Sequence, residues 1–357
     1  MKTLRYSIFS LALAGLFFTS CTKDQDDRID NDPDPIPTAA YQKGILVSNE
    51  GPFGSGSGTV TFISEDYSRV EKDIYKKVNG IDLGNVVNSI GFENGKAYIV
   101  ANNSNRMMVA DRYSFEAAGT VASGLDNPRH FVATDSNIGY VTNWGDPMNE
   151  SDDYVAVVDL QSNTVTSTIS VPFGPEKMLV NNNRIYVAHQ GGYGHHHIIS
   201  VISGGVVENT ITVGDAPNSM VKIGNFLYVL GGGKPDYTGD ETAGTLSKID
   251  LTTETVVERI DFETTDHPEH LTADGDMLFF NLNGKVYKLS AGAITANPTP
   301  VLDGYFYAMT AKDGKLFATD AGDFASNGKM YVYDLSNGEK LYDFEVGVIP
   351  GGIYFNE

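Results

Sequence analysis

Short runs in which aromatic and β-branched residues alternate with polar ones recur along the chain from residue 44 to its end. Such runs are typical of half-buried strands, and no amphipathic helical pattern competes with them. Six of these runs occupy equivalent places in successive segments, at residues 97–100, 139–143, 184–188, 226–230, 277–280 and 315–319. The pattern therefore predicts an all-β chain built from repeated units.

Most of these units begin with an X-Pro step. The five steps are Asn127-Pro128, Gly174-Pro175, Ala216-Pro217, His267-Pro268 and Ile349-Pro350. Two further segments, which begin at Val87 and Phe306, fit the same frame without a proline, so that the units start 38 to 51 residues apart. This period is in the range of a four-stranded propeller blade.

The two ends of the repeat region complement each other. The last unit has only a first strand, at residues 352–355, whereas the first part of the region supplies candidate strands at residues 44–48, 59–63 and 70–77. A blade assembled from both termini would leave no open sheet edge where the ring closes. The expected fold is therefore a seven-bladed β-propeller over residues 41–357, with the last blade closed by N- and C-terminal strands.

Composition is consistent with one large β domain and restricts its partners. Hydrophobic residues make up 41% of the chain and charged residues 20%, enough for a sizeable core. The formal net charge is −21, and a surface of this sign repels nucleic acid and anionic membranes. No nucleic-acid partner is expected, although the acidity is equally consistent with a role in solubility alone.

The N-terminus predicts secretion and lipidation. Lys2 and Arg5 precede an apolar stretch, residues 8–18, that is too short to span a membrane, and residues 18–21 are similar to a lipobox. Residues 1–20 are thus expected to be a lipoprotein signal peptide. Cys21, the only cysteine, cannot form a disulfide within the chain and is placed for lipidation. The acidic, proline-containing residues 21–40 predict a flexible tether.

Several motifs carry a resemblance to a known family. Residues 140–143 read Tyr-Val-Thr-Asn, the signature of YVTN-type propeller repeats, and residues 48–54, 83–89, 100–105 and 344–351 extend the likeness. Together they resemble the YncE-like seven-bladed propellers that are surface lipoproteins of Bacteroidota, over residues 44–357. The acidic residues after Cys21 resemble the export signal of such lipoproteins, which implies an outer-membrane anchor with the protein facing the cell exterior. A lipoprotein that faces the periplasm is the alternative.

The resemblance also implies a function. Some members of this group capture cobamides, the vitamin B12 class of corrinoids, and hand them to a TonB-dependent outer-membrane transporter. The corresponding expectation for this chain is a protein without enzymatic activity or resident cofactor. It would bind a small-molecule ligand, with a cobamide the first candidate, and its protein partner would be such a transporter.

The expected ligand site lies on one face of the propeller. The turn before each innermost strand and the loop between the second and third strands lie on the same face, and long loops on a rigid scaffold commonly carry binding sites. Aromatic side chains stack on flat rings and amide groups need paired donors and acceptors, a mixture that suits a corrinoid. The expected ligand-binding residues are Phe53, Asn103, Arg106, Arg129, His130, Asn143, Trp144, Gln190, Tyr193, Asn218, Tyr237, Tyr307 and Phe324.

Three alternatives to this function remain open. Histidines 195, 197 and 270 are weak candidates for metal or haem binding, but no cysteine or suitably spaced carboxylate joins them, so that no metal site is expected. A cation-dependent propeller lyase or lactonase would use oxygen ligands such as Glu176, Asn218 and Glu269. No Gly-x-Ser-x-Gly, HExxH or phosphate-binding glycine motif supports catalysis. The third alternative is a propeller that binds only proteins.

Overall fold

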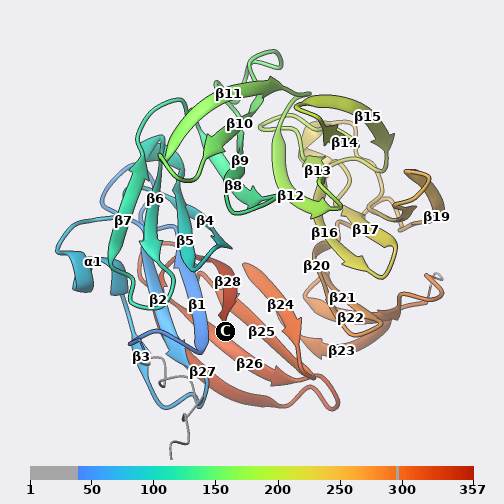
Figure 1. Ribbon diagram of the computed structural model, residues 1–357. Coiled ribbons are helices and arrows are strands. Elements are labelled where there is room, and N and C mark those ends of the chain that lie inside the picture. Colours follow the sequence, from blue (N-terminus) through green and yellow to red (C-terminus); the bar gives the residue numbers. More distant parts are fainter. Residues whose placement is uncertain (1–38, 295–296) are drawn as a thin grey trace, which may run out of the picture. The chain divides into compact units, whose positions relative to one another are not determined.

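Seven four-stranded antiparallel sheets follow one another in a ring (Figure 1). They are seen in a computed structural model that describes residues 39–294 and 297–357. The predicted signal peptide, Cys21 and most of the predicted tether lie outside the described residues. The seven-bladed all-β fold that the repeat predicts is confirmed.

The blades are numbered here in chain order, and each is given from its innermost to its outermost strand. Blades 1 to 4 consist of β28 (Pro350–Asn356), β1 (Gly44–Asn49), β2 (Thr59–Ser64) and β3 (Val70–Glu71); β4 (Val87–Glu93), β5 (Lys96–Ala101), β6 (Arg106–Asp111) and β7 (Ala117–Val121); β8 (Pro128–Ala133), β9 (Ile138–Asn143), β10 (Tyr154–Asp159) and β11 (Thr164–Ser170); and β12 (Pro175–Asn181), β13 (Arg184–His189), β14 (Ile198–Ser203) and β15 (Val206–Thr212). Blades 5 to 7 consist of β16 (Pro217–Ile223), β17 (Phe226–Gly231), β18 (Thr245–Asp250) and β19 (Thr255–Asp261); β20 (Glu269–Asp274), β21 (Met277–Leu282), β22 (Lys285–Ser290) and β23 (Thr299–Asp303); and β24 (Ala308–Lys312), β25 (Lys315–Asp320), β26 (Asn327–Asp334) and β27 (Lys340–Val348).

Blade 1 closes the ring with strands from both ends of the described chain. Strand β28 pairs antiparallel with β1, so that Asn356 lies opposite Gly44 and Ile353 opposite Val47. The innermost strands contact their neighbours around the whole ring, including β24 with β28 and β28 with β4. The predicted closure by N- and C-terminal strands is therefore confirmed.

The outer part of blade 1 differs from the sequence prediction of a strand over residues 70–77. Only Val70–Glu71 pairs as β3, and residues Ile74–Asn79 form the helix α1. Ile74 and Tyr75 are adjacent and both fully buried, packed with Phe62 in one core cluster. Gly80 ends the helix in a left-handed conformation, a common helix stop. A helical turn buries both side chains on one side, whereas in a strand adjacent residues point to opposite faces.

Hydroxyl groups beside the channel join adjacent blades. The side chain of Ser89 donates to the carbonyl oxygen of Arg129 over 2.7 Å, and that of Thr142 donates to the carbonyl oxygen of Glu176 over 2.9 Å. Thr319 donates in the same way to Pro350, which links blade 7 to strand β28 of blade 1. These bonds join three pairs of neighbouring blades beside the channel.

Aspartate at the end of the third strand, a recurrent feature of the sequence, shapes the following turn. The carboxylate of Asp159 accepts hydrogen bonds from the backbone N–H groups of Gln161 and Ser162. Asp334 accepts one from Ser336 in the equivalent turn of blade 7. These are Asx turns, in which the side chain substitutes for a backbone acceptor. The repeated aspartate therefore has a structural role on the face opposite the predicted site.

Candidate functional site

The start of each innermost strand forms one rim of the channel. In five blades, the residue directly before the innermost strand has a left-handed backbone, with φ between 51° and 65°. These residues are Val86, Asn127, Gly174, Ala216 and Ile349. The carbonyl oxygen at this position accepts a hydrogen bond from the backbone just after the second strand, as from Gly232 to Ala216 over 2.9 Å. These turns and the loops between second and third strands therefore share one face, which we call the mouth face. The conformation is strained for the β-branched Val86 and Ile349, and such strain concentrates at functional sites.

Bulges then direct side chains into the channel. In six of the seven described blades the pairing of the innermost strand shifts by one residue directly after this turn. A β-bulge of this kind bends the strand and re-aims its side chains. The result is a polar ring at the mouth that consists of Asn88, Arg129, His130, Glu176, Lys177, Asn218 and His270. In six of the seven units, the residue three positions after the unit's start is apolar and lines the cavity below the polar groups; these residues, the apolar ring, are Phe131, Met178, Met220, Leu271, Met309 and Ile353.

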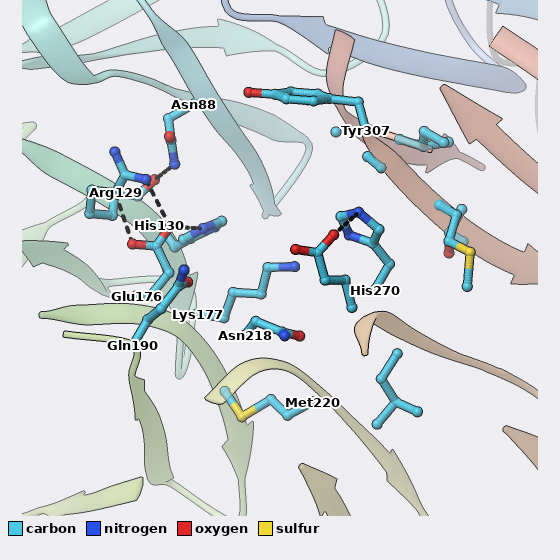
Figure 2. A pocket seen from close by; sticks show the side chains of 18 of the residues that line it. Asn88, Arg129, His130, Glu176, Lys177, Gln190, Asn218, Met220, His270 and Tyr307 are labelled. Atoms are coloured by element: carbon cyan, nitrogen blue, oxygen red, sulfur yellow. Dashed lines mark hydrogen bonds and ion pairs between the residues drawn. The ribbon is translucent and has the colours of Figure 1, made fainter. Parts of the chain in front are cut away.

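These two rings enclose a cavity of about 520 Å³. Figure 2 shows the labelled polar side chains of blades 2 to 7 arranged around the cavity, with Met220 at its edge. Glu50, from the loop after β1, and Tyr307, just before β24, complete the polar wall. Every blade contributes to this cavity, so that its shape depends on the closed ring.

The strongest electrostatic feature of the wall is a three-residue network. Arg129 donates two hydrogen bonds to the Glu176 carboxylate, at 2.8 and 3.0 Å, and His130 Nε2 donates a third at 3.2 Å. Burial raises the pKa of Glu176, but the charge of Arg129 and the bond from His130 outweigh it and hold that pKa below its ordinary value. Burial also lowers the pKa of His130, although the bond to Glu176 opposes this shift.

Trp144 supports this network from the loop after β9. The guanidinium of Arg129 lies 4.0 Å from the centre of the indole ring, a cation–π contact. The indole Nε1 donates to the carbonyl oxygen of Pro175 over 3.0 Å, which links blades 3 and 4. Trp144 is the only tryptophan of the chain and thus a natural fluorescence reporter at the edge of the cavity.

Across the cavity, Tyr307 donates its phenolic hydrogen to Glu50 over 2.9 Å. Burial raises the pKa of Tyr307, and the carboxylate of Glu50 adds to the effect. Burial also raises the pKa of Glu50, although the bond from Tyr307 and the charge of Arg129 oppose this. This side of the cavity is therefore a hydrogen-bonding surface with a carboxylate that is less readily ionised than usual.

Other polar groups in the cavity have unused hydrogen-bonding capacity. Within residues 39–294 and 297–357, the ammonium of Lys177 and the side-chain amide of Gln190 have no hydrogen-bond partner, and Lys177 has no ion pair. His270 Nε2 donates to the carbonyl oxygen of Phe306 over 3.1 Å, which leaves Nδ1 as an acceptor. Burial, with the nearby charge of Lys177, lowers the pKa of His270 to about 4. These groups can bind a polar ligand without breaking internal contacts.

Exposed aromatic side chains surround the mouth. Six aromatic residues are exposed in the described part of the chain, and five of them lie on the mouth face. We call these five the aromatic rim, which consists of Phe53, Tyr193, Tyr237, Tyr305 and Phe324. Tyr237 is 85% exposed and Phe53 77%, so that neither contributes to the core. Exposed aromatic groups in this number around one cavity are typical of a binding surface.

The structure brings together some of the predicted site residues. Arg129, His130, Gln190, Asn218 and Tyr307 line the cavity. Four others lie on the mouth face around it, in loops that follow second strands, namely Phe53, Tyr193, Tyr237 and Phe324. The ring centres of Phe324 and Tyr307 are 5.6 Å apart, and those of Tyr193 and Trp144 are 6.4 Å apart. The aromatic rim is therefore continuous with the cavity wall.

Three predicted residues have internal partners instead. The buried Asn143 donates to Val141 and accepts from the backbone of Asp126. Arg106 donates to the carbonyl oxygen of Leu83, and the side chain of Asn103 donates to that of Asn85. None of the three lines the cavity. Their side chains hold the loops of blades 2 and 3 in place.

Several cavity residues were absent from the predicted set. Glu50 is buried against the channel because the chain turns inward directly after β1, a feature without a sequence motif. Lys177 occupies a bulged position, which the alignment of the X-Pro units marks as facing the channel. The apolar ring was also recognisable in that alignment, because Met178, Met220 and Met309 occupy the same place in three units.

The histidine candidates do not converge. His195 and His197 line a separate cavity of about 340 Å³ with Glu150 and Phe173, whereas His270 faces the channel. No group of three or more histidine, cysteine, aspartate or glutamate side chains is arranged to hold a metal ion within the described residues. In the same part of the chain, no helix is long and apolar enough to cross a bilayer.

The fold and the cavity define a seven-bladed β-propeller with a polar channel mouth that every blade lines. The model of one protein family matches residues 43–355, nearly the whole propeller. The chain therefore belongs to the family described as "Domain of unknown function (DUF5074)". No curated protein matches the chain.

Solved structures with the same fold are distant in sequence. BamB from Moraxella catarrhalis is 14% identical, with a TM-score of 0.53, over 90% of this chain and 89% of that one. The dihydro-heme d1 dehydrogenase NirN, in complex with DHE, is 12% identical, with a TM-score of 0.56, over 90% and 77% of the two chains. Hydrazine synthase of Kuenenia stuttgartiensis is 18% identical, with a TM-score of 0.54, over 69% and 76%. These likenesses support the propeller fold alone.

Proposed function

We propose that this protein is a binding protein that captures a cobamide on its mouth face and passes it to a TonB-dependent outer-membrane transporter. The observation that carries the proposal is the combination of the aromatic rim with the polar cavity that it surrounds. A corrinoid has a flat ring system with many amide side chains. The rim offers surfaces for the ring, and the cavity offers donors and acceptors for the polar groups.

The size of the cavity suggests how such a ligand would bind. A volume of about 520 Å³ is in the range that encloses a drug-sized molecule. A cobamide is larger, so that part of it would enter the cavity while the ring system rests on the rim. The name of one structural neighbour, dihydro-heme d1 dehydrogenase, connects the same fold with another large macrocycle. The motif resemblance to cobamide-capturing lipoproteins supports the same ligand class.

The geometry gives less support to a cation-dependent lyase or lactonase. Such an enzyme would need the oxygens of Glu176, Asn218 and Glu269 for a metal ion. The Glu176 carboxylate already accepts three hydrogen bonds from Arg129 and His130. The oxygen of the Asn218 side chain accepts a bond from Ser219, and its nitrogen donates to Pro268. We therefore favour ligand binding over catalysis.

Binding should depend on the exposed aromatic side chains. Tyr237→Ala is expected to weaken cobalamin binding by about 1–4 kcal/mol, as truncation of an aromatic hot spot does. Because this side chain is 85% exposed, its removal should leave the melting temperature unchanged. Calorimetric titration measures the effect, and Tyr342→Ala, an exposed tyrosine on the outermost strand β27, is the control. Equal affinities of Tyr237→Ala and wild type would exclude the rim from the site.

The proposed location depends on Cys21, which lies outside the described residues. We expect Cys21→Ala to release the protein from membrane fractions, because this is the only residue able to carry a thioether-linked lipid. Immunoblots of soluble and membrane fractions measure this. Unchanged membrane partitioning would contradict the lipoprotein assignment.

A further inference from the structure

We propose that Lys177 and Gln190 form a subsite for an anionic phosphodiester, the group that joins the nucleotide arm of a complete cobamide to its corrin ring. This inference rests on the proposed function, and it names the part of the ligand that enters the cavity. Both side chains belong to blade 4, with Lys177 in the bulge of β12 and Gln190 directly after β13. Both line the cavity (Figure 2).

The charge of Lys177 lacks a counterion within the described residues. The carboxylate next to it in sequence, Glu176, is bound by Arg129 and His130. The carboxylate of Glu269, which also lines the cavity, lies 3.6 Å from Nε2 of His270, whose lowered pKa keeps this imidazole uncharged near neutral pH. Among residues 39–294 and 297–357, no carboxylate oxygen lies within 4.0 Å of the Lys177 nitrogen. Burial lowers the pKa of Lys177, and the charge of the neighbouring Glu176 opposes this only in part.

The chemistry of the two side chains favours an anion over a neutral amide. An ammonium group only donates hydrogen bonds, and its bonds to charged oxygen are about twice as strong as those to neutral acceptors. The amide N–H groups of Gln190 provide a second donor on the same wall. A phosphodiester has two non-bridging oxygens that share one negative charge. One oxygen can accept from the ammonium of Lys177 and the other from the amide of Gln190. Burial of Glu50 raises its pKa, which reduces the repulsion that it would exert.

The test compares two corrinoids that differ in this group. Cobalamin carries the nucleotide arm and its phosphodiester, whereas cobinamide lacks both. Both are titrated by calorimetry into wild type, Lys177→Met and the control Lys222→Met, which removes an exposed lysine of β16. We expect wild type and the control to bind cobalamin at least about tenfold more tightly than cobinamide. We expect Lys177→Met to lose this preference while its affinity for cobinamide stays unchanged.

The outcomes separate this inference from the proposed function. If wild type and Lys177→Met bind both corrinoids with equal affinity, the subsite is wrong and corrinoid binding stands. If neither corrinoid binds, the proposed function fails, and titration with inorganic phosphate decides the subsite alone. If wild type then binds phosphate saturably and Lys177→Met does not, the anion subsite is supported. If wild type binds no phosphate either, the anion subsite is overturned.

Discussion

We expect removal of residues 351–357 to lower the free energy of unfolding of the whole propeller by about 5 kcal/mol. The deletion takes away nearly all of β28 and leaves β1 without its inner partner. Three partly buried side chains, Ile353, Tyr354 and Phe355, leave the clusters that join blade 1 to its neighbours. A fully buried side chain of this size contributes about 1.5–3 kcal/mol. Urea unfolding measures the loss.

The structure provides a control for this deletion. Removal of Glu357 alone eliminates an exposed ion pair with Lys312, which is worth at most about 1 kcal/mol. The larger deletion also removes Asn356, which donates to the carbonyl oxygens of Tyr41 and Arg112. If both truncated proteins unfold at the same urea concentration as the full chain, closure of the ring by β28 does not stabilise the fold.

The second large effect concerns the network at the mouth. Glu176→Gln should destabilise the protein by about 3–5 kcal/mol at neutral pH, because it leaves the Arg129 guanidinium in the cavity wall without its carboxylate. The side chains of Glu176 and Arg129 are only 9% and 18% exposed, so that water compensates little. The double variant Arg129→Gln, Glu176→Gln removes both charges and should be more stable than the single one. Equal stability of wild type and Glu176→Gln would contradict the role given to this pair.

The pH dependence of this contribution follows from the direction of the shift. The pKa of Glu176 in the folded protein lies below its ordinary value of 4.5. A carboxyl group with a lowered folded pKa stabilises the fold above its unfolded pKa, and the contribution is lost as pH falls through the folded value. The difference in stability between wild type and Glu176→Gln should therefore be constant from pH 7 to pH 5 and decline only in more acid solution.

The fold was predictable from the sequence because each level of the pattern agrees with the others. The period of the X-Pro units, the alternating runs and the complementary ends all specify one closed ring. Residues 72–77 were wrongly predicted as strand because local alternation does not reveal that Ile74 and Tyr75 must both reach the same core. Periodicity over so few residues does not distinguish a helical turn from a strand.

The site was predictable only in outline. Repeat position identified the residues that face the channel, such as Arg129 and Asn218, because the bulge recurs in six of the seven described blades. Side-chain partners depend on contacts between blades, which the repeat does not encode. Thus Asn143 resembles a ligand contact in sequence but bonds to Val141 of its own strand and to the backbone of Asp126, and Glu50 gains its place only when blade 1 closes.

The most direct test of the central claim is a titration of wild-type protein with cobalamin, with haem as the comparison ligand. Trp144 lies at the edge of the cavity and is the only tryptophan, so that its fluorescence reports on occupancy of the mouth. The account predicts saturable quenching of this emission by cobalamin at a ratio of one ligand per protein, and weaker binding after Tyr237→Ala. Absence of saturable cobalamin binding would contradict the proposed function. It would also be contradicted if Tyr237→Ala left cobalamin binding unaltered while haem bound through His195, His196 and His197.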